Sequence, residues 1–306
     1  MRPTLLAIGV SAACHAPSPP PKAPEAACAA ALPALAAKHT RNVTRIYLAT
    51  LELAGEKLTI GAPAPLTDKR GYVNQPAFDA DGAGLYFTWR PEGGQADIWH
   101  HEVASGKERP ITCTSEEEYS ATPTRDGLIA LRIVADGSRA LVRLGPDGQT
   151  RERLFPGVAD LGAYLWIDDA HVAMFFGGAD GTRLAIGDAR SGAMRDVATG
   201  VAAAMTATAG GGALGYVEQR ADSAQLMRLD LTTGAIVPVV TLPDGVEKFA
   251  WLGDGSVLAG AGRTIVRASA ADPTWREVGR FDDRLEGTIT RVIAGAGRLA
   301  IVTRVE

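Results

Sequence analysis

A chain of 306 residues, 46% of them hydrophobic, is long enough to bury one large core or two medium ones. Its net charge is −4 and no Lys/Arg-rich run occurs, so the sequence offers no electrostatic footprint for nucleic acid. No stretch of about 18 consecutive apolar residues is present, which argues against a membrane-spanning helix.

Residues 1–14 predict an export signal. An arginine is followed by the apolar run Leu5–Val10 and by small residues that end at Cys14. The segment resembles a bacterial lipoprotein signal, in which such a cysteine becomes the lipid-modified N-terminus. Ser11 departs from that pattern, which prefers an aliphatic residue there. A plain secretory signal cleaved near Ala13 or Ala16 is the alternative. The first interpretation makes Cys14 the lipidation site, and both interpretations predict export.

Residues 15–42 are rich in Pro and Ala, a composition typical of a semi-rigid, polyproline II-prone tether. The three cysteines, Cys14, Cys28 and Cys113, match no metal-binding spacing. If Cys14 carries a lipid, Cys28 and Cys113 could form a disulfide in an oxidising compartment. Two free or buried thiols are the other possibility.

From residue 43 to the end, the sequence repeats with a period of about 43 residues. Aromatic residues before a turn fall in register in PAFDADG, YLWIDDA and FAWLGDG, at Phe78, Trp166 and Trp251. A second turn follows an alternating strand in each unit, and its glycines lie 42 to 44 residues apart at Gly106, Gly148, Gly192 and Gly234. Four strands in about 43 residues predict one blade of a β-propeller.

The units count to six. Complete units begin near residues 66, 113, 157, 200 and 245. The stretch 289–305 supplies only two strands, and 43–60 supplies the other two. The sequence therefore predicts an all-β, six-bladed propeller over residues 43–306, whose last blade is closed by strands from both termini. Such sharing removes the free sheet edges that invite aggregation.

The stretch from Asn74 to Thr112, with NQPAFDADGAGLYFTW followed by DIW and PIT, resembles one repeat of the TolB-like propeller family. YSATPTRDGLIALR (119–132) is a looser match. The resemblance covers about 260 residues and implies a cell-envelope protein that binds a partner or ligand at a mouth of its central tunnel. Residues 15–42 do not form the separate N-terminal domain of TolB, so the partners of TolB are not carried over.

The aspartates of FDADGAGLYFTW raise the question of a calcium loop. With Gly82 at the sixth position, an EF-hand-type loop needs ligands at Ala77, Asp79, Asp81 and Thr88, and only two of these are carboxylates. A tight turn needs only the Asp and Gly that are present. A hairpin turn is predicted.

No catalytic or metal constellation is evident. His100 and His101 are adjacent in a predicted strand and point to opposite faces, and His171 stands alone at a turn. No Gly-x-Ser-x-Gly nucleophile motif occurs. The expectations are therefore no cofactor, no metal and no catalytic residue, in a monomer of the periplasm or outer membrane that binds an envelope protein.

Binding at the tunnel mouth is the predicted function. Candidate residues precede or begin the innermost strand of several units; they are Arg70, Tyr72, Asn74, Glu118, Tyr119, Tyr164 and Lys248. Aromatic side chains beside charges suit recognition surfaces. A solvated acidic loop is the alternative for SEEEYS (115–120). The tryptophans Trp89, Trp99, Trp166 and Trp251 are expected to pack between blades. The alternative function is a lyase or hydrolase acting on an extracellular glycan or small molecule in the tunnel.

Overall fold

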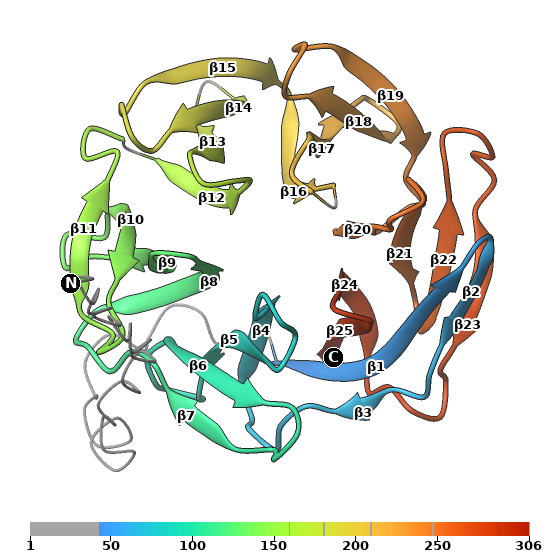
Figure 1. The fold of residues 1–306 in the computed structure, drawn as a ribbon, viewed down its shortest axis with the longest axis horizontal. Helices are drawn as coiled ribbons and strands as arrows, with labels where there is room; N and C mark the ends of the chain where they lie inside the picture. Colours follow the sequence, from blue (N-terminus) through green and yellow to red (C-terminus); the bar gives the residue numbers. More distant parts are fainter. Residues whose placement is uncertain (1–42, 159, 180, 209, 247, 306) are drawn as a thin grey trace, which may run out of the picture.

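The computed structural model describes residues 43–305 except 159, 180, 209 and 247, and these residues form a ring of six antiparallel sheets (Figure 1). Each sheet is one blade, and its first strand in the chain lies nearest the ring axis in blades 1 to 5. Helices are absent from the described part of the chain, so none there is long and apolar enough to cross a membrane. The predicted all-β, six-bladed propeller is confirmed.

The blades are numbered in chain order of their innermost strands. Blade 1 consists of β4 (Tyr72–Phe78), β5 (Gly84–Arg90), β6 (Asp97–Glu102) and β7 (Glu108–Pro110), and blade 2 of β8 (Glu117–Thr124), β9 (Gly127–Ile133), β10 (Arg139–Leu144) and β11 (Thr150–Leu154). Blade 3 consists of β12 (Leu161–Trp166), β13 (His171–Gly178), β14 (Gly181–Asp188) and β15 (Met194–Thr199), and blade 4 of β16 (Val201–Ala207), β17 (Ala213–Gln219), β18 (Ala224–Asp230) and β19 (Ile236–Thr241). Blade 5 consists of β20 (Phe249–Trp251), β21 (Val257–Ala261), β22 (Thr264–Ala268) and β23 (Arg276–Arg280).

Blade 6 joins the two ends of the described chain. It contains β24 (Thr288–Gly295), β25 (Arg298–Val305), β1 (Val43–Ala54) and β2 (Lys57–Ile60), in that order from the axis outward. β1 pairs antiparallel with β25, from Val43 opposite Val305 to Thr50 opposite Arg298. The predicted closure is confirmed. A short strand that was not predicted, β3 (Ala64–Pro65), also pairs with β1.

The described chain begins beside the start of the innermost strand of blade 1. The N–H of Thr44 donates to the carbonyl of Gly71 at 3.0 Å, and the N–H of Val73 donates to Oγ1 of Thr44 at 2.9 Å. Val43 and Val305 are therefore close to Tyr72, where β4 begins. We call the end of the ring where the innermost strands begin the N-terminal mouth.

The hydrophobic core is divided into six clusters, one between each pair of neighbouring blades. Inward-facing residues of one sheet pack on those of the next, as in a sandwich. The cluster between blades 1 and 2 is the smallest, with seven buried members, of which Ala121, Ala130 and Ala140 are alanines. This interface therefore buries less apolar side chain than the others.

The recurring Asp-Gly turn is a hairpin turn. Gly82 has φ of +70°, a conformation that glycine adopts without steric cost. Its N–H donates to the carbonyl of Asp79 at 3.0 Å, and Oδ1 of Asp81 accepts from the N–H of Ala83 at 2.9 Å. The carboxylate of Asp79 contacts His100. The two aspartates thus stabilise the turn and its neighbouring strand.

A bulge interrupts the innermost strand of blades 1, 2, 3, 4 and 6. At the bulges of β4 and β8, Gln75 and Ser120 have φ of +58° and +56°. Oε1 of Gln75 accepts from the N–H of Ser120 at 2.8 Å, and the hydroxyl of Tyr164 donates to the carbonyl of Ser120. Side chains of blades 1 and 3 therefore satisfy the backbone groups that the bulge of blade 2 removes from its sheet.

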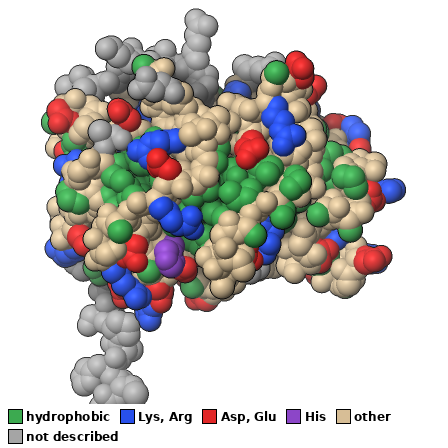
Figure 2. Space-filling model, turned by 90° about the horizontal axis from the view of Figure 1, so that it is seen from above, with side chains coloured by type: hydrophobic (Ala, Val, Ile, Leu, Met, Phe, Trp, Pro, Cys, Tyr) green, Lys and Arg blue, Asp and Glu red, His purple; other side chains and the backbone are tan. Residues whose placement is uncertain are grey.

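The outer rim exposes apolar side chains on blades 3 and 4. Met194 on β15 is 43% exposed, and Ile236 and Val237 on β19 are 40% and 45% exposed. Figure 2, which looks from above Figure 1, shows hydrophobic side chains on this rim among charged ones. Pro238 lies in β19, and a proline in an outermost strand limits pairing with another chain.

We predict that Tyr164→Phe destabilises the propeller by about 1–3 kcal/mol. The substitution leaves the buried carbonyls of Ser120 and Ile129 without the hydroxyl that donates to them. Urea denaturation measures the loss. Tyr216→Phe is the matched control, because within the described residues its hydroxyl has one hydrogen bond, a 3.3 Å contact with the side chain of Glu218, and a smaller change is expected. Equal stability of Tyr164→Phe and the unmodified protein would contradict the prediction.

Candidate functional site

Aromatic and charged side chains of blades 1 and 2 gather at the N-terminal mouth. The rings of Tyr72 on β4 and Tyr119 on β8 meet edge to face, with centroids 6.3 Å apart. Arg90, at the end of β5, lies 5.7 Å from the Tyr72 ring centroid and places Nη1 3.5 Å from the Tyr119 hydroxyl. That hydroxyl donates to Oε2 of Glu117 at 3.1 Å. We call Tyr72, Arg90, Glu117 and Tyr119 the mouth cluster.

The electrostatics of the mouth cluster keep both tyrosines protonated. Burial raises the pKa of Tyr72, although the positive charges of Arg291 and Arg90 oppose this. Burial also raises the pKa of Tyr119, and the negative charge of Glu117 adds to the effect. Both phenols are neutral at physiological pH. They can donate and accept hydrogen bonds and can stack, but they are poor general bases.

The other half of the ring supplies no charged residues to its innermost strands. β12, β16 and β20 read LGAYLW, VAAAMTA and FAW, without Asp, Glu, Lys, Arg or His. Blade 6, which is next to blade 1, contributes Arg291 from β24, and its positive charge acts to lower the pKa of Tyr72. The ionisable groups therefore gather on blades 1, 2 and 6.

Of the residues predicted for binding, Tyr72 and Tyr119 belong to the mouth cluster. Arg70 is exposed, and its carbonyl accepts from Nε1 of Trp89 at 2.8 Å. The half-buried Asn74 accepts from the N–H of Gln75 through Oδ1 at 2.7 Å. Lys248 donates from Nζ to the carbonyl of Ala203 in the neighbouring blade. These contacts give Asn74 and Lys248 roles in holding the backbone.

Glu118 and Tyr164 are not displayed at the mouth, and the expectation for them is corrected. The Glu118 side chain is 0% exposed, because successive residues of a strand point to opposite faces and Glu117 and Tyr119 take the mouth side. Tyr164 is 8% exposed, and its hydroxyl is directed at the bulge of blade 2. The sequence pattern predicted the strands that contain Glu118 and Tyr164, but it did not show which side of each strand is buried against another blade.

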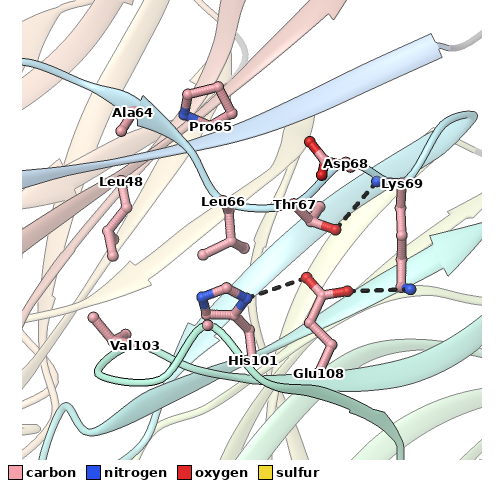
Figure 3. Close-up of a pocket in the computed structure, with 11 residues that line it drawn as sticks. Leu48, Ala64, Pro65, Leu66, Thr67, Asp68, Lys69, His101, Val103 and Glu108 are labelled. Carbon is pink, nitrogen blue, oxygen red and sulfur yellow. Dashed lines mark hydrogen bonds and ion pairs between the residues drawn. The ribbon is translucent and has the colours of Figure 1, made fainter.

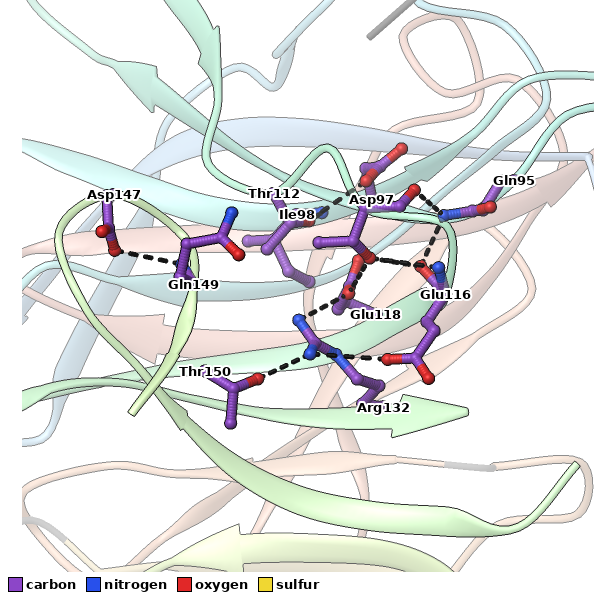
Figure 4. Close-up of polar contacts among 11 residues, drawn as sticks. Gln95, Asp97, Ile98, Thr112, Glu116, Glu118, Arg132, Asp147, Gln149 and Thr150 are labelled. Carbon is purple, nitrogen blue, oxygen red and sulfur yellow. Dashed lines mark hydrogen bonds and ion pairs between the residues drawn. The ribbon is translucent and has the colours of Figure 1, made fainter. Parts of the chain in front are cut away.

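Behind the mouth cluster, Glu118 takes part in a buried polar network at the seam of blades 1 and 2 (Figure 4). Oε1 of Glu118 accepts from Oγ1 of Thr114 at 2.6 Å and lies 2.9 Å from Nη2 of Arg132. The same guanidinium is 3.5 Å from Glu116. Asp97 of blade 1 accepts from Oγ1 of Thr112 at 3.2 Å.

The two buried acids of this network titrate near neutral pH. Burial raises the pKa of Asp97 to about 7, and the charge of Glu118 adds to the effect. Burial raises the pKa of Glu118 to about 7 as well, although Thr114 and Arg132 oppose it. Oε2 of Glu118 is buried and has no hydrogen-bond partner within the described part of the chain. Carboxyl groups with such shifts occur at functional sites and in structural networks alike.

A groove of about 810 Å³ lies on the rim between blades 6 and 1 (Figure 3). Leu48, Leu66 and Val103 supply apolar lining, and Lys69, His101 and Glu108 form a polar wall. Glu108 accepts from Nδ1 of His101 at 3.1 Å and pairs with Nζ of Lys69 at 3.1 Å.

The polar wall of this groove is internally paired. Burial acts to raise the pKa of Glu108, but hydrogen bonds from His101, Thr67 and Lys69 lower it below the usual range. Nζ of Lys69 also lies 3.7 Å from the Trp99 ring centroid and 4.6 Å from that of Trp89. The charges of this wall therefore stabilise the joint between blades 6 and 1.

A second cavity, of about 820 Å³, lies at the opposite end of the ring. Its lining comes from turns of blades 1, 3 and 4, and includes Ala80, Asp168, Asp169, Arg190 and Thr208. Asp168 accepts from Nδ1 of His171, and Asp169 pairs with Arg125. Asp168 is thus engaged with a histidine of its own blade, and Asp169 with an arginine in the adjacent turn of blade 2.

The tryptophans pack between blades as predicted. Trp99 and Trp251 are 6% and 8% exposed, and Trp89 and Trp166 are half-buried against neighbouring core clusters. The rings of Trp89 and Trp99 meet edge to face with centroids 5.2 Å apart. These side chains contribute burial to the ring and are not a binding platform.

Histidine and cysteine positions bear on metal and redox chemistry. His100 contacts Asp79 and His101 contacts Glu108, so the adjacent rings point to opposite faces as predicted. Among the described residues, no group of three His, Cys, Asp or Glu side chains is arranged to hold a metal ion. Cys113 is disulfide-bonded. The lipidation predicted at Cys14 and the pairing considered for Cys28 involve residues outside the described part of the chain.

Sequence reasoning missed Arg90, Asp97 and Arg132. Arg90 ends the alternating strand GLYFTWR, and Asp97 opens the DIWHHE strand, so each was assigned to a strand without a role. The one sequence signal for Arg90 is weak: it is a charged residue at the end of a predicted strand near the tunnel. Asp97 and Arg132 could not be found from sequence, because they belong to a network between two blades and no nearby sequence pattern marks them.

Comparison with known proteins supports the fold. The chain is similar to the structure of a protein assigned as TolB from Agrobacterium tumefaciens, with a TM-score of 0.60 and 11% identity over 87% of this chain and 99% of that one. It is also similar to an oligogalacturonate lyase in complex with manganese, with a TM-score of 0.53 and 16% identity over 79% of both chains. The propeller domain of Cps50 (Swd1) from Myceliophteria thermophila gives a TM-score of 0.53 and 13% identity over 86% of this chain and 98% of that one.

No family model matches the chain, and no curated protein matches its sequence. At these identities the structural likeness establishes the fold alone: the chain has a propeller fold like those of TolB and WD40-type proteins.

We predict that Arg132→Met lowers the free energy of unfolding by about 3 kcal/mol at pH 8, because it leaves the buried Glu118 carboxylate without its cation. The loss should be smaller at pH 5, where Glu118 can take up a proton. Urea denaturation at both pH values measures the difference.

Arg151→Met is the matched control for this prediction. Arg151 pairs with Asp147 on the surface, with side chains 54% and 34% exposed, so a loss of about 0–1 kcal/mol is expected. Equal losses of unfolding free energy for the two substitutions would show that the Arg132 contacts stabilise the fold no more than an exposed ion pair does.

Proposed function

We propose that this protein is an exported propeller of the bacterial cell envelope that binds a protein partner, or another ligand, at its N-terminal mouth without catalysing a reaction. The mouth cluster is the observation that carries the proposal. It places two half-buried tyrosines and an arginine from two blades within contact distance of one another. Tyrosine and arginine are enriched among the residues that dominate binding energy at interfaces.

The chemistry of the mouth cluster favours recognition over catalysis. Paired-carboxylate catalysis needs two carboxyl groups on either side of a substrate bond. Glu117 is the single carboxylate of the mouth cluster, and the acid pair Asp97 and Glu118 is buried in the seam. With both phenols protonated, Tyr72 and Tyr119 are suited to hydrogen bonding and stacking with a bound chain.

A propeller enzyme remains the second candidate. It is supported by the convergence of ionisable groups from blades 1, 2 and 6 near Tyr72 and by the similarity to the oligogalacturonate lyase fold. A lyase of this kind would need a base at the mouth, and Glu117 is the candidate. Turnover that is lost in Glu117→Gln while ligand binding persists would favour this second function.

The position of the chain start fits a tethered binding protein. Val43 lies beside the N-terminal mouth, so the predicted tether of residues 15–42 leaves next to the mouth cluster. A 28-residue spacer with the polyproline II rise reaches on the order of 90 Å at most. An anchor at Cys14 would therefore keep the mouth cluster within this distance of the membrane surface.

We predict that a photo-crosslinking amino acid at position 70 captures a partner in intact cells. Arg70 is exposed and lies two residues before Tyr72, and it is its backbone carbonyl that accepts from Nε1 of Trp89. The same group at position 190, at the opposite end of the ring, should capture none. Mass spectrometry of the crosslinked species measures both.

The double variant Tyr72→Ala/Tyr119→Ala should reduce the crosslink from position 70 at least tenfold, because it removes the stacked pair while Val73 and the core remain. His171→Ala, on a turn of blade 3, is the control and should leave it unchanged. Undiminished crosslinking by the double variant would overturn the assignment of the mouth cluster as the binding site.

A separate prediction concerns the anchor. Metabolic labelling with radioactive palmitate should label the unmodified protein and the Cys28→Ser variant, but not Cys14→Ala. Label retained in Cys14→Ala would contradict lipidation at that residue, and membrane fractionation of the same variants reports whether the anchor determines location.

A further inference from the structure

The seam between blades 1 and 2 differs from the other five interfaces because it combines a small apolar cluster with buried acidic side chains. Its apolar cluster is the smallest of the six and is rich in alanine. Next to it, Asp97 of β6 and Glu118 of β8 are 7% and 0% exposed. The polar network of this seam occupies volume that larger apolar side chains fill elsewhere in the ring.

Backbone contacts of the seam hold the first residues of β8 against blade 1. The N–H of Glu118 donates to the carbonyl of Ala96 at 3.0 Å. Nε2 of Gln95 donates to the carbonyl of Thr114 at 2.8 Å and to that of Glu116. Since Glu117 and Tyr119 flank Glu118, the position of β8 at this seam sets the position of half of the mouth cluster.

The charges of the network do not balance when all its acids are ionised. Glu118 and Glu116 share one guanidinium, that of Arg132, and the negative charges of Glu118 and Glu117 both act on Asp97. The hydroxyl of Thr112 donates to Asp97 and that of Thr114 to Glu118, and the hydroxyl of Thr150 accepts from Arg132. Asp97 also has a hydrogen bond with the backbone of Thr114.

Among the described residues, none donates a hydrogen bond to Oε2 of Glu118, so a full negative charge at that atom would lack a donor there. Two carboxyl groups in one buried site relieve such an excess by retaining a proton. Burial raises the pKa of both Asp97 and Glu118 to about 7, in agreement with this account.

We propose that Asp97 and Glu118 form a proton-dependent latch: a proton retained by the pair keeps blades 1 and 2 closed, and its loss loosens β8 together with Glu117 and Tyr119. The latch itself is a property of the fold. Its effect on ligand capture rests on the function proposed for the mouth cluster.

The sign of the pH dependence follows from the raised pKa values. The folded pair keeps its protons to higher pH than the unfolded carboxyl groups, which release theirs near pH 4. The stabilisation is therefore full below about pH 4 and declines as the pH rises through about 7. Several surface aspartates with lowered pKa values act in the opposite sense at acid pH, including Asp168 and Asp254. Local measurements and matched variants separate the two effects.

Hydrogen exchange of the full chain, followed by mass spectrometry between pH 5.5 and 8.5, tests the latch. Protection factors, which are corrected for the intrinsic pH dependence of exchange, are compared for β8 (117–124) and for β18 (224–230) on the far side of the ring. The protection of β8 relative to β18 should fall at least fivefold between pH 6 and 8.

Two variants assign this change to the acid pair. The double variant Asp97→Asn/Glu118→Gln keeps the shapes of both side chains but removes both titrating groups, so the pH dependence of β8 protection should disappear. Glu116→Gln alters the partly exposed outer member of the network and leaves the pair intact, so the pH dependence should persist. Protection of β8 that does not change with pH in the unmodified protein would overturn the proposal, even if neither variant folds. Pronounced pH dependence that survives in Asp97→Asn/Glu118→Gln would overturn it as well.

The crosslink from position 70 distinguishes failure of the latch from failure of the proposed function. Equal capture at pH 6 and pH 8 with constant β8 protection refutes the latch alone. Absence of capture at both pH values, with β8 protection that falls as expected, refutes the binding function and supports the latch.

Discussion

The antiparallel pairing of β1 with β25 is the interaction on which the whole ring depends. Five blades are each built from one continuous stretch of chain, so the hydrogen bonds within them form between residues close in sequence. Blade 6 alone brings together strands that lie more than 240 residues apart, from Val43 opposite Val305 to Thr50 opposite Arg298. The core clusters on both sides of blade 6 include residues of β1, among them Ile46 and Tyr47. Loss of this pairing would expose two interfaces as well as two sheet edges.

Within the closed ring, the apolar interfaces and the proposed recognition surface lie on different blades. Blades 3 to 5 offer apolar or small residues to the axis and join through apolar clusters. Blades 1 and 2 instead meet through Glu118, Arg132 and Asp97, and present Tyr72 and Tyr119 at the mouth. The contacts of Ser120 with side chains of blades 1 and 3 connect the two halves at mid-height of the innermost strands.

The architecture was predictable from sequence because its signals are local and repeated. Aromatic residues precede the inner turn in three of the units, at Phe78, Trp166 and Trp251, and Gly82 has a left-handed conformation in the first of these turns. The closure followed from counting strands at the two ends. The candidate site was predictable only in part: Tyr72 and Tyr119 lie in the mouth cluster, whereas Glu118 and Tyr164 are buried.

The misplaced residues depend on strand geometry and on packing between blades. Bulges in the innermost strands change which side chain faces the axis, and nothing in the local sequence marks Gln75 or Ser120 as the residues with positive φ. The partners of Glu118 come from a second blade and from the loop between blades, and so depend on how the sheets pack. Which side chains are buried, and which residues of another blade they contact, depends on how the sheets pack. The repeat pattern of the sequence does not contain this information.

Because the two ends of the described chain lie opposite each other in one blade, the ring has no structurally required beginning. A circular permutant that links residue 305 to residue 43 and opens the chain at an exposed turn would retain every blade. Opening it in a turn such as 189–193, on the opposite face, would move the point of attachment without altering the mouth cluster. The position of the termini therefore determines which face of a tethered ring points away from its anchor. The fold does not change when the termini are moved.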